Sequence, residues 1–207
     1  MTHFYRAEHH STPSPSELGW QRHSPLAIAE LVKNTIEIGT YELPDSALGH
    51  WLQHGIEKIG AQDGYGTEAV LEWLREGRLL MSQEYFCGKL DDVEVQWQAG
   101  LLQFYDSYGV TNGSGTHVRV WLEPQLDEHL REDSAAAMRS FASTLLHELC
   151  HAMLARYSCE NGCNEGYCRS HWFVETGPSY HGTAWQAIKS RIETAWAERL
   201  GFEMRLF

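Results

Sequence analysis

The sequence predicts an α+β fold, a single domain in which helices make up most of the chain and a small antiparallel sheet packs against them. Apolar residues recur at helical spacing on both sides of a short central region. Within that region, residues 93–97 and 118–122 alternate apolar with polar side chains, as strands with one buried face do. Residues 133–157 contain neither glycine nor proline, and they predict one long helix in the core.

The chain divides into three parts by composition and pattern. Residues 1–19 hold three histidines among serine and proline and show no periodicity, which predicts a disordered tail. Residues 20–78 predict an N-terminal helical segment, and residues 79–207 predict the main domain with the sheet and the long helix. A hydrophobic content of 43% and eight tryptophans are enough to build one sizeable core.

Capping residues indicate helix boundaries in the N-terminal segment. Ser24 followed by Pro25 has the pattern of an N-cap and a first helical residue. Thr67 is expected to cap a later helix, which Gly77 would break. Residues 79–86 would then form a further helical stretch.

Three short strands are expected between these helices and the long helix. The first and third are the alternating segments 93–97 and 118–122, and the apolar, aromatic segment 101–108 predicts the second. Residues 112–115 have the sequence Asn-Gly-Ser-Gly and predict a turn before the third strand. Strands that follow one another so closely favour antiparallel pairing.

The long helix carries an H-E-x-x-H motif formed by His147, Glu148 and His151. Residues four apart lie on the same face of a helix, so both imidazoles can bind one metal ion. Glu148 lies about 100° around the helix from His147, which puts its carboxylate beside the metal, where a general base is needed. The alternative is a pair of helix histidines that only pack or face solvent.

A catalytic zinc ion usually has three protein ligands and one open position, so a third ligand must follow the helix. The compact metzincin pattern would need a glycine at position 154 and a histidine at position 157. The chain has Leu154 and Tyr157 there, which excludes that pattern. The remaining downstream candidates are His171, Glu175 and His181.

The surroundings of these candidates favour His181. Gly177 and Pro178 follow Glu175 closely and argue against a helical position for that carboxylate. His181 lies where a loop meets the amphipathic helix expected from Thr183, a place from which a side chain can point back into a cleft.

Residues 159–178 predict a loop rich in glycine and cysteine. Cys159, Cys163, Cys168 and His171 together offer three thiols and an imidazole, which are the ligands of a closed, structural Cys3His zinc site. They are therefore candidate ligands of a second zinc ion. The alternative is a set of reduced thiols that bind no metal.

The chain contains no stretch near the roughly 18 apolar residues that a membrane span requires. The first residues also lack the apolar core of a signal peptide. We therefore expect an intracellular protein of the nucleus or the cytoplasm, with no membrane partner.

Four short motifs between residues 80 and 200 occur together in one protein family. They are Tyr85-Phe86-x-Gly88-Lys89-Leu90, Val93-x-Val95-x-Trp97, Leu145-Leu146-His147-Glu148-Leu149-Cys150-His151-Ala152 and His181-Gly182-x-x-Trp185. In this combination, the chain resembles the SprT-like zinc metallopeptidase domain. The resemblance implies a zincin-like fold for residues 79–207, with the H-E-x-x-H helix in its core.

The resemblance also implies a role for each site residue. His147, His151 and His181 would bind the zinc ion, and Glu148 would be catalytic. The family includes Spartan-type proteases, which degrade proteins crosslinked to DNA. The resemblance thus implies a protease with protein substrates, DNA as a partner and a role in nuclear DNA repair. The net charge of −12, however, argues against a broad DNA-binding surface.

The expected reaction is hydrolysis of a peptide bond by a water molecule that zinc makes more acidic. Glu148 would take the proton and pass it to the leaving amine. Tyr180, next to His181, is a candidate donor of a hydrogen bond to the oxyanion. Two alternatives remain: a non-catalytic, zinc-stabilised interaction module, and a zinc hydrolase that acts on a non-peptide amide.

Overall fold

The fold is α+β, mostly helical, with a small mixed sheet of three strands. It is taken from a computed structural model that describes residues 12–19, 23–38, 47–59, 66–126, 133–159, 166–177, 179–200 and 206. Most of the tail predicted for residues 1–19 lies outside these ranges. Leu18, which belongs to that segment, is buried and packs in the hydrophobic core.

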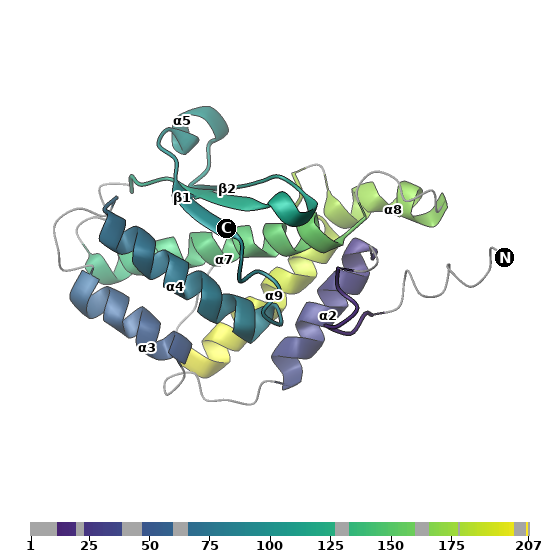
Figure 1. Ribbon diagram of the computed structural model, residues 1–207, viewed down its shortest axis with the longest axis horizontal. Coiled ribbons are helices and arrows are strands. Elements are labelled where there is room, and N and C mark those ends of the chain that lie inside the picture. Colours follow the sequence, from purple (N-terminus) through teal and green to yellow (C-terminus); the bar gives the residue numbers. More distant parts are fainter. Residues whose placement is uncertain are drawn as a thin grey trace.

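The described elements surround one long central helix (Figure 1). In chain order, the helices are α2 (Pro25–Ile38), α3 (Ala47–His54), the π-helical turn η2 (Gly55–Ile59), α4 (Glu68–Tyr85), α5 (Leu101–Tyr105), the 3-10 turn η3 (Gly115–His117), α7 (Ser134–Tyr157), α8 (Gly166–Thr176) and α9 (Thr183–Leu200). The strands are β1 (Glu94–Trp97), β2 (Gly109–Asn112) and β3 (Arg119–Leu122).

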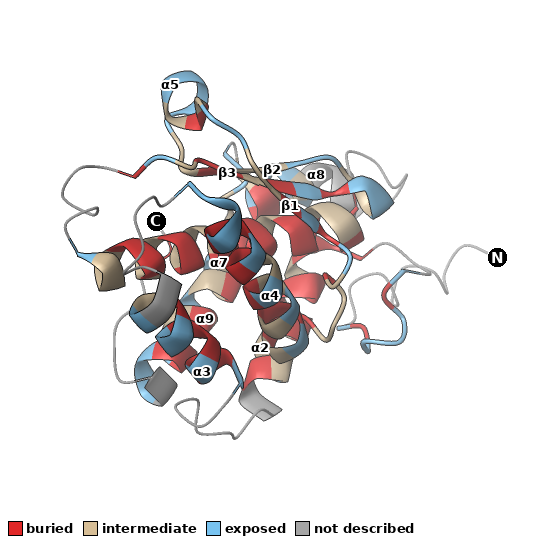
Figure 2. Cartoon of the chain, turned by 60° about the vertical axis from the view of Figure 1, so that its left-hand side comes forward, coloured by how far each residue is buried: buried red, intermediate tan, exposed pale blue. Residues whose placement is uncertain are grey.

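Helix α7 is the central element, as the absence of helix breakers predicted. Asp133 caps it by accepting hydrogen bonds from the backbone N–H groups of Ala135 and Ala136, at 2.9 and 3.2 Å. The sheet lies along one side of α7, and α2, α4 and α9 pack around the rest. Leu145 and Leu149 are fully buried, and Figure 2 shows buried residues along most of the helix. The close packing around α7 therefore restricts the orientations of its side chains.

Helix α4 is one continuous helix, and the predicted break at Gly77 is wrong. Thr67 caps it as expected, by accepting a hydrogen bond from the N–H of Val70. A Cβ atom at Gly77 would lie 2.1 Å from Cζ2 of Trp51. The indole ring of Trp51 can therefore pack against α4 only because position 77 has no side chain. Trp51 in turn stacks on Trp73, with ring centroids 4.2 Å apart. Tertiary packing thus outweighs the low helix propensity of glycine.

The sheet has the strand order β1-β3-β2 and is mixed, so the predicted antiparallel sheet is only partly correct. Strand β1 pairs in parallel with β3, with Val95 opposite Val120. Strand β2 pairs antiparallel with β3, with Thr111 also opposite Val120. Strand β2 therefore forms one edge of this sheet, and it lies against α7.

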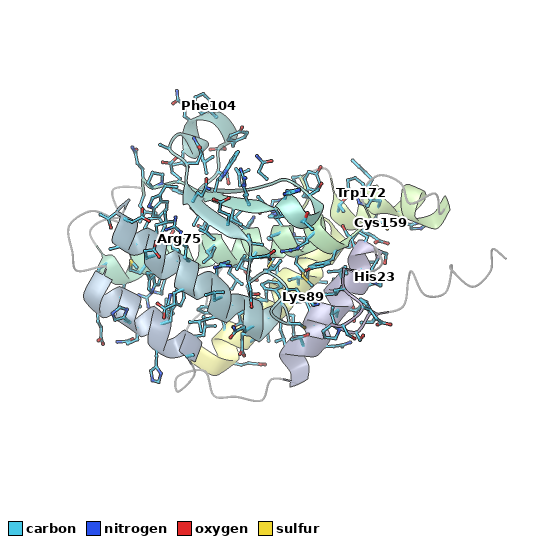
Figure 3. The ribbon with its side chains drawn as sticks, viewed as in Figure 1. His23, Arg75, Lys89, Phe104, Cys159 and Trp172 are labelled. Atoms are coloured by element: carbon cyan, nitrogen blue, oxygen red, sulfur yellow. The ribbon has the colours of Figure 1, made fainter. Side chains whose placement is uncertain are left out.

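The strand predicted for residues 101–108 is wrong, because residues 101–105 form the short helix α5. Its apolar residues do not share a buried face: Leu101 is 1% exposed, whereas Phe104 and Tyr105 are 74% and 62% exposed. The helix projects from the sheet, with Phe104 at its outer surface (Figure 3). The true second strand follows at 109–112 and ends where the turn was expected.

The loop predicted for residues 159–178 is also partly wrong, because residues 166–176 form α8. The helix ends at Gly177, which has a left-handed φ of +73° and donates its N–H to the Phe173 carbonyl at 2.8 Å. Glu175 is therefore helical, contrary to the argument from the Gly-Pro pair. None of the described helices combines the length and the apolarity that a membrane crossing requires.

Candidate metal centre

Three histidine rings converge at one point, two from α7 and one from the residues just before α9. His147 and His151 lie one helical turn apart on α7, and His181 lies two residues before the start of α9. Each of the three Nε2 atoms lies 3.1 Å from the other two. Within the described ranges, this is the one group of three or more His, Cys, Asp or Glu side chains close enough to hold a metal ion.

The geometry of these nitrogens fits a bound cation. A neutral imidazole nitrogen offers either one N–H or one lone pair, so three nitrogens in mutual contact cannot all be paired by hydrogen bonds. A tetrahedral ion at roughly 2.0–2.1 Å from each nitrogen would hold its ligands roughly 3.3 Å apart. The observed 3.1 Å triangle is close to that spacing. The three histidines are thus close enough to bind one metal ion.

Burial keeps the imidazoles available as ligands. The pKa of His151 lies well below its ordinary value, first because the ring is buried and then because His147 and His181 are adjacent. Burial also lowers the pKa of His181, with a smaller contribution from the positive charge of Lys189. Neutral rings keep the lone pairs that a metal requires.

The ring of Trp185 packs against all three imidazoles. Its ring centroid lies 4.8 Å from that of His147, 4.4 Å from that of His181 and 5.5 Å from that of His151, on which it stacks. Trp185 is 1% exposed and lies in the first turn of α9, four residues after His181. A large, immobile aromatic side chain therefore restricts how far each ring can rotate.

A close contact between α8 and α9 fixes the position of His181. The N–H of Gly182 donates to the carbonyl of Thr176, at 2.7 Å. A Cβ atom at Gly182 would lie 2.4 Å from the Thr176 carbonyl carbon and 2.5 Å from the Glu175 oxygen, so only glycine fits. Ser179 Oγ lies 3.2 Å from His181 Nδ1 and can bond to that nitrogen while Nε2 faces the centre.

Glu148 lies beside the three rings and is 4% exposed. Its Oε1 is 3.9 Å from His147 Nε2, and the hydroxyl of Thr111 bonds to its Oε2 at 2.7 Å. Burial raises the pKa of Glu148 to about 7, although the hydrogen bonds from Thr111 act in the opposite direction. A carboxyl group with such a pKa can both take and give a proton near neutral pH.

The centre opens into a cavity of about 440 Å³ between β2, α7 and the segment from α8 to His181. Gly109 and Thr111 of β2 line one side, and Trp172 of α8, labelled in Figure 3, lines the other. Tyr180 also lines the cavity; it is 60% exposed and has a φ of +60°. A ligand can therefore reach Glu148 and the imidazoles from solvent.

The structure distinguishes among the three candidates for the third ligand. His181 joins the cluster. His171 has an exposed side chain on α8, outside the cluster. Glu175 is buried and accepts a hydrogen bond from the N–H of Leu26 at 3.3 Å, so it links α8 to α2.

The predicted second zinc site lies largely outside the described residues. Cys163 falls in an undescribed segment, and the side chain of Cys168 is likewise not described. Cys159 is buried just after α7, and its N–H donates to the His23 carbonyl at 2.8 Å (Figure 3). The Cys159, Cys163, Cys168 and His171 site stays a prediction.

Sequence reasoning missed two residues at the centre, Gly109 and Thr111. Both belong to β2, which has no alternating pattern that would have marked it as a strand. Thr111 contacts a residue 37 positions later in the chain, a relationship that no local motif encodes.

Comparison with known proteins gives no assignment: no family model matches the chain, and no curated protein sequence matches it.

Proposed function

We propose that the protein is a zinc-dependent metalloendopeptidase of the SprT-like type, with a zincin-like fold. One observation carries the proposal: three imidazole nitrogens 3.1 Å apart lie beside a buried carboxyl group, that of Glu148, at the edge of an open cavity. Three histidines and a fourth, open position are the ligand set of a catalytic zinc ion. Zinc would thus be held by His147, His151 and His181.

In this proposal, the chain's own residues carry the proton. When bound, zinc polarises the carbonyl group of a substrate and makes a neighbouring water molecule more acidic. Glu148 Oε1 takes a proton from that water as the water oxygen forms a bond to the carbonyl carbon. Glu148 then gives the proton to the amide nitrogen as the C–N bond breaks, and a carboxylic acid and an amine leave.

The edge strand β2 supports a peptide as the substrate. Its residues Gly109, Val110 and Thr111 line the cavity next to Glu148. An extended peptide can pair with the free edge of a strand through main-chain hydrogen bonds, whatever its side chains are. Tyr180 is 60% exposed and lines the same cavity, and its hydroxyl is proposed to donate to the oxyanion.

DNA-associated proteins are the substrate class that the resemblance to Spartan-type proteases suggests. A role in DNA repair would place the protein in the nucleus. The net charge of −12 favours recognition of the protein part of such a substrate over broad contact with the DNA.

Replacement of Glu148 tests the proposal. Glu148→Gln retains the shape of the side chain, so we expect full zinc content but a loss of about 100-fold or more in cleavage of unfolded casein. Zinc content and cleavage are measured on the same preparations, with and without single-stranded DNA. A Glu148→Gln variant that cleaves casein at the wild-type rate would refute the proposal.

A non-catalytic, zinc-stabilised module is the second candidate, because the centre links α7 to the residues before α9. Such a module needs no carboxyl group beside its metal ligands. Burial of Glu148 has an energetic cost, because the charged carboxylate is more stable in water, and a non-catalytic module would gain nothing from it. If chelation unfolds the protein but neither the wild type nor Glu148→Gln cleaves any substrate, this second function is favoured.

A further inference from the structure

The hydroxyl of Thr111 contacts Glu148 twice. Thr111 Oγ1 lies 2.7 Å from the carboxyl oxygen Oε2 and 2.8 Å from the backbone carbonyl oxygen of the same residue. These contacts join strand β2 to helix α7 across 37 positions of sequence. Both distances are ordinary for hydroxyl hydrogen bonds, and Thr111 is half-buried while Glu148 is buried.

The single hydroxyl proton of Thr111 has two acceptors within reach, and one of them, Oε2, can accept it in either protonation state of Glu148. When the carboxyl group is ionised, the Thr111 hydroxyl donates to Oε2, the stronger acceptor. When the carboxyl group carries a proton on Oε1, Oε2 still accepts from Thr111. The bond to Oε2 therefore persists while the other carboxyl oxygen gains or loses its proton.

The backbone of β2 also packs closely against the Glu148 side chain at Gly109. A Cβ atom at Gly109 would lie 2.8 Å from Glu148 Cγ, so the strand backbone lies directly against this side chain. Oε1 is left on the side of His147, 3.9 Å from its Nε2. The backbone of Gly109 and the hydroxyl of Thr111 therefore both restrict the orientation of the Glu148 side chain.

We propose that Thr111 is a positioning residue: its hydroxyl holds Glu148 Oε2, so that Oε1 faces the three histidines and exchanges the proton with the attacking water. This inference rests on the proposed function, and it adds a residue that the H-E-x-x-H motif does not include. A hydrogen bond that fixes a catalytic group restricts it to the reactive geometry before substrate arrives.

The test compares Thr111→Val with Thr111→Ser. Valine keeps the volume and the branched Cβ that suit a strand but removes the hydroxyl, whereas serine keeps the hydroxyl. Thr144→Val is the matched control, because the Thr144 hydroxyl donates to the Ser140 carbonyl, one helical turn before Glu148. Each zinc-loaded variant is assayed for kcat, KM and zinc affinity. The conformation of the Glu148 side chain is determined in crystals of the metal-free protein.

We expect Thr111→Val to lower kcat by about 10- to 100-fold, with KM and zinc affinity near their wild-type values. We expect Thr111→Ser to recover most of the loss, and Thr144→Val to match the wild type. Crystals of Thr111→Val should show Glu148 in more than one orientation, whereas the other three proteins show one.

An unchanged kcat in Thr111→Val, with Glu148→Gln inactive, would overturn the role of Thr111 and leave the proposed function standing. Loss of kcat in both Thr111 variants without recovery by serine would overturn it as well, because the loss would then follow from packing. If the wild type itself cleaves nothing, the proposed function fails instead. The orientation of Glu148 in the crystals then decides the role of Thr111 alone.

Discussion

Gly109 on β2 lies so close to Glu148 on α7 that a Cβ atom at position 109 would be 2.8 Å from Glu148 Cγ and 3.0 Å from Oε1. The same atom would lie 2.8 Å from Cγ2 of Thr144. The strand backbone and the motif helix are therefore in direct contact at the carboxyl group. This contact brings the edge of the sheet to the metal centre, and it depends on the absence of a side chain.

Gly109→Ala should impair the centre without removing its ligands. The added methyl group must displace either Glu148 or the strand, so we expect cleavage to fall by about 10-fold or more and stability by about 1–3 kcal/mol. Zinc content, casein cleavage and the melting temperature check this. Asn112→Ala is the control, because Asn112 is exposed at the end of the same strand and does not line the cavity. Normal cleavage by Gly109→Ala would mean that the strand is not held against Glu148.

Glu148→Gln should stabilise the metal-free protein, and more so at higher pH. The pKa of Glu148 is raised to about 7 in the folded state, against an ordinary value of 4.5, so the folded state binds its proton more tightly. Stability is therefore lost as the pH rises through about 7, by about 3 kcal/mol in full, and glutamine avoids that loss.

The measurement is the free energy of unfolding of both metal-free proteins at about pH 5 and about pH 8. We expect the advantage of Glu148→Gln to be large at the higher pH and small at the lower one. An advantage of equal size at both values would show that the carboxyl group does not titrate in this range.

Gly182→Ala should weaken metal binding through His181. A Cβ atom there would lie 2.4 Å from the carbonyl carbon of Thr176, so the residues before α9 must move away from α8. We expect zinc affinity to fall by about 10- to 100-fold, as it does when a residue that supports a ligand is lost. Competition with a chelator measures the zinc affinity. Thr183→Ala, at the exposed neighbouring position, is the control. Wild-type affinity in Gly182→Ala would contradict the role of this contact.

The sequence allowed the central helix and the arrangement of its motif to be predicted, because both depend on local rules. An unbroken run after the Asp133 cap predicts a helix, and spacing by four predicts that His147 and His151 share a face. His181 could be favoured from its place before α9. Its convergence with the other two rings, however, depends on the contact of Gly182 with α8, which is a tertiary feature.

Most of the errors lie where tertiary contacts, rather than local patterns, determine the structure. Strand β2 (Gly109–Asn112) has a glycine and an asparagine at its ends and resembles a turn, and pairing with β3 makes it a strand. Leu101, Phe104 and Tyr105 suggested a strand by composition, yet only Leu101 is buried. The hydrogen bond between Thr111 and Glu148 could not be predicted either, because the sequence pattern does not specify that β2 contacts α7.

Titration of the metal-free protein with cobalt(II) determines whether His147, His151 and His181 bind one divalent ion together. Cobalt(II) takes the place of zinc and reports its ligands by absorption, and thiolate charge-transfer bands would distinguish any ion in the cysteine cluster. We predict that one equivalent binds without such bands, that His181→Ala abolishes this binding and that His171→Ala retains it. Binding that is unchanged in His181→Ala would mean that the three histidines do not share one ion.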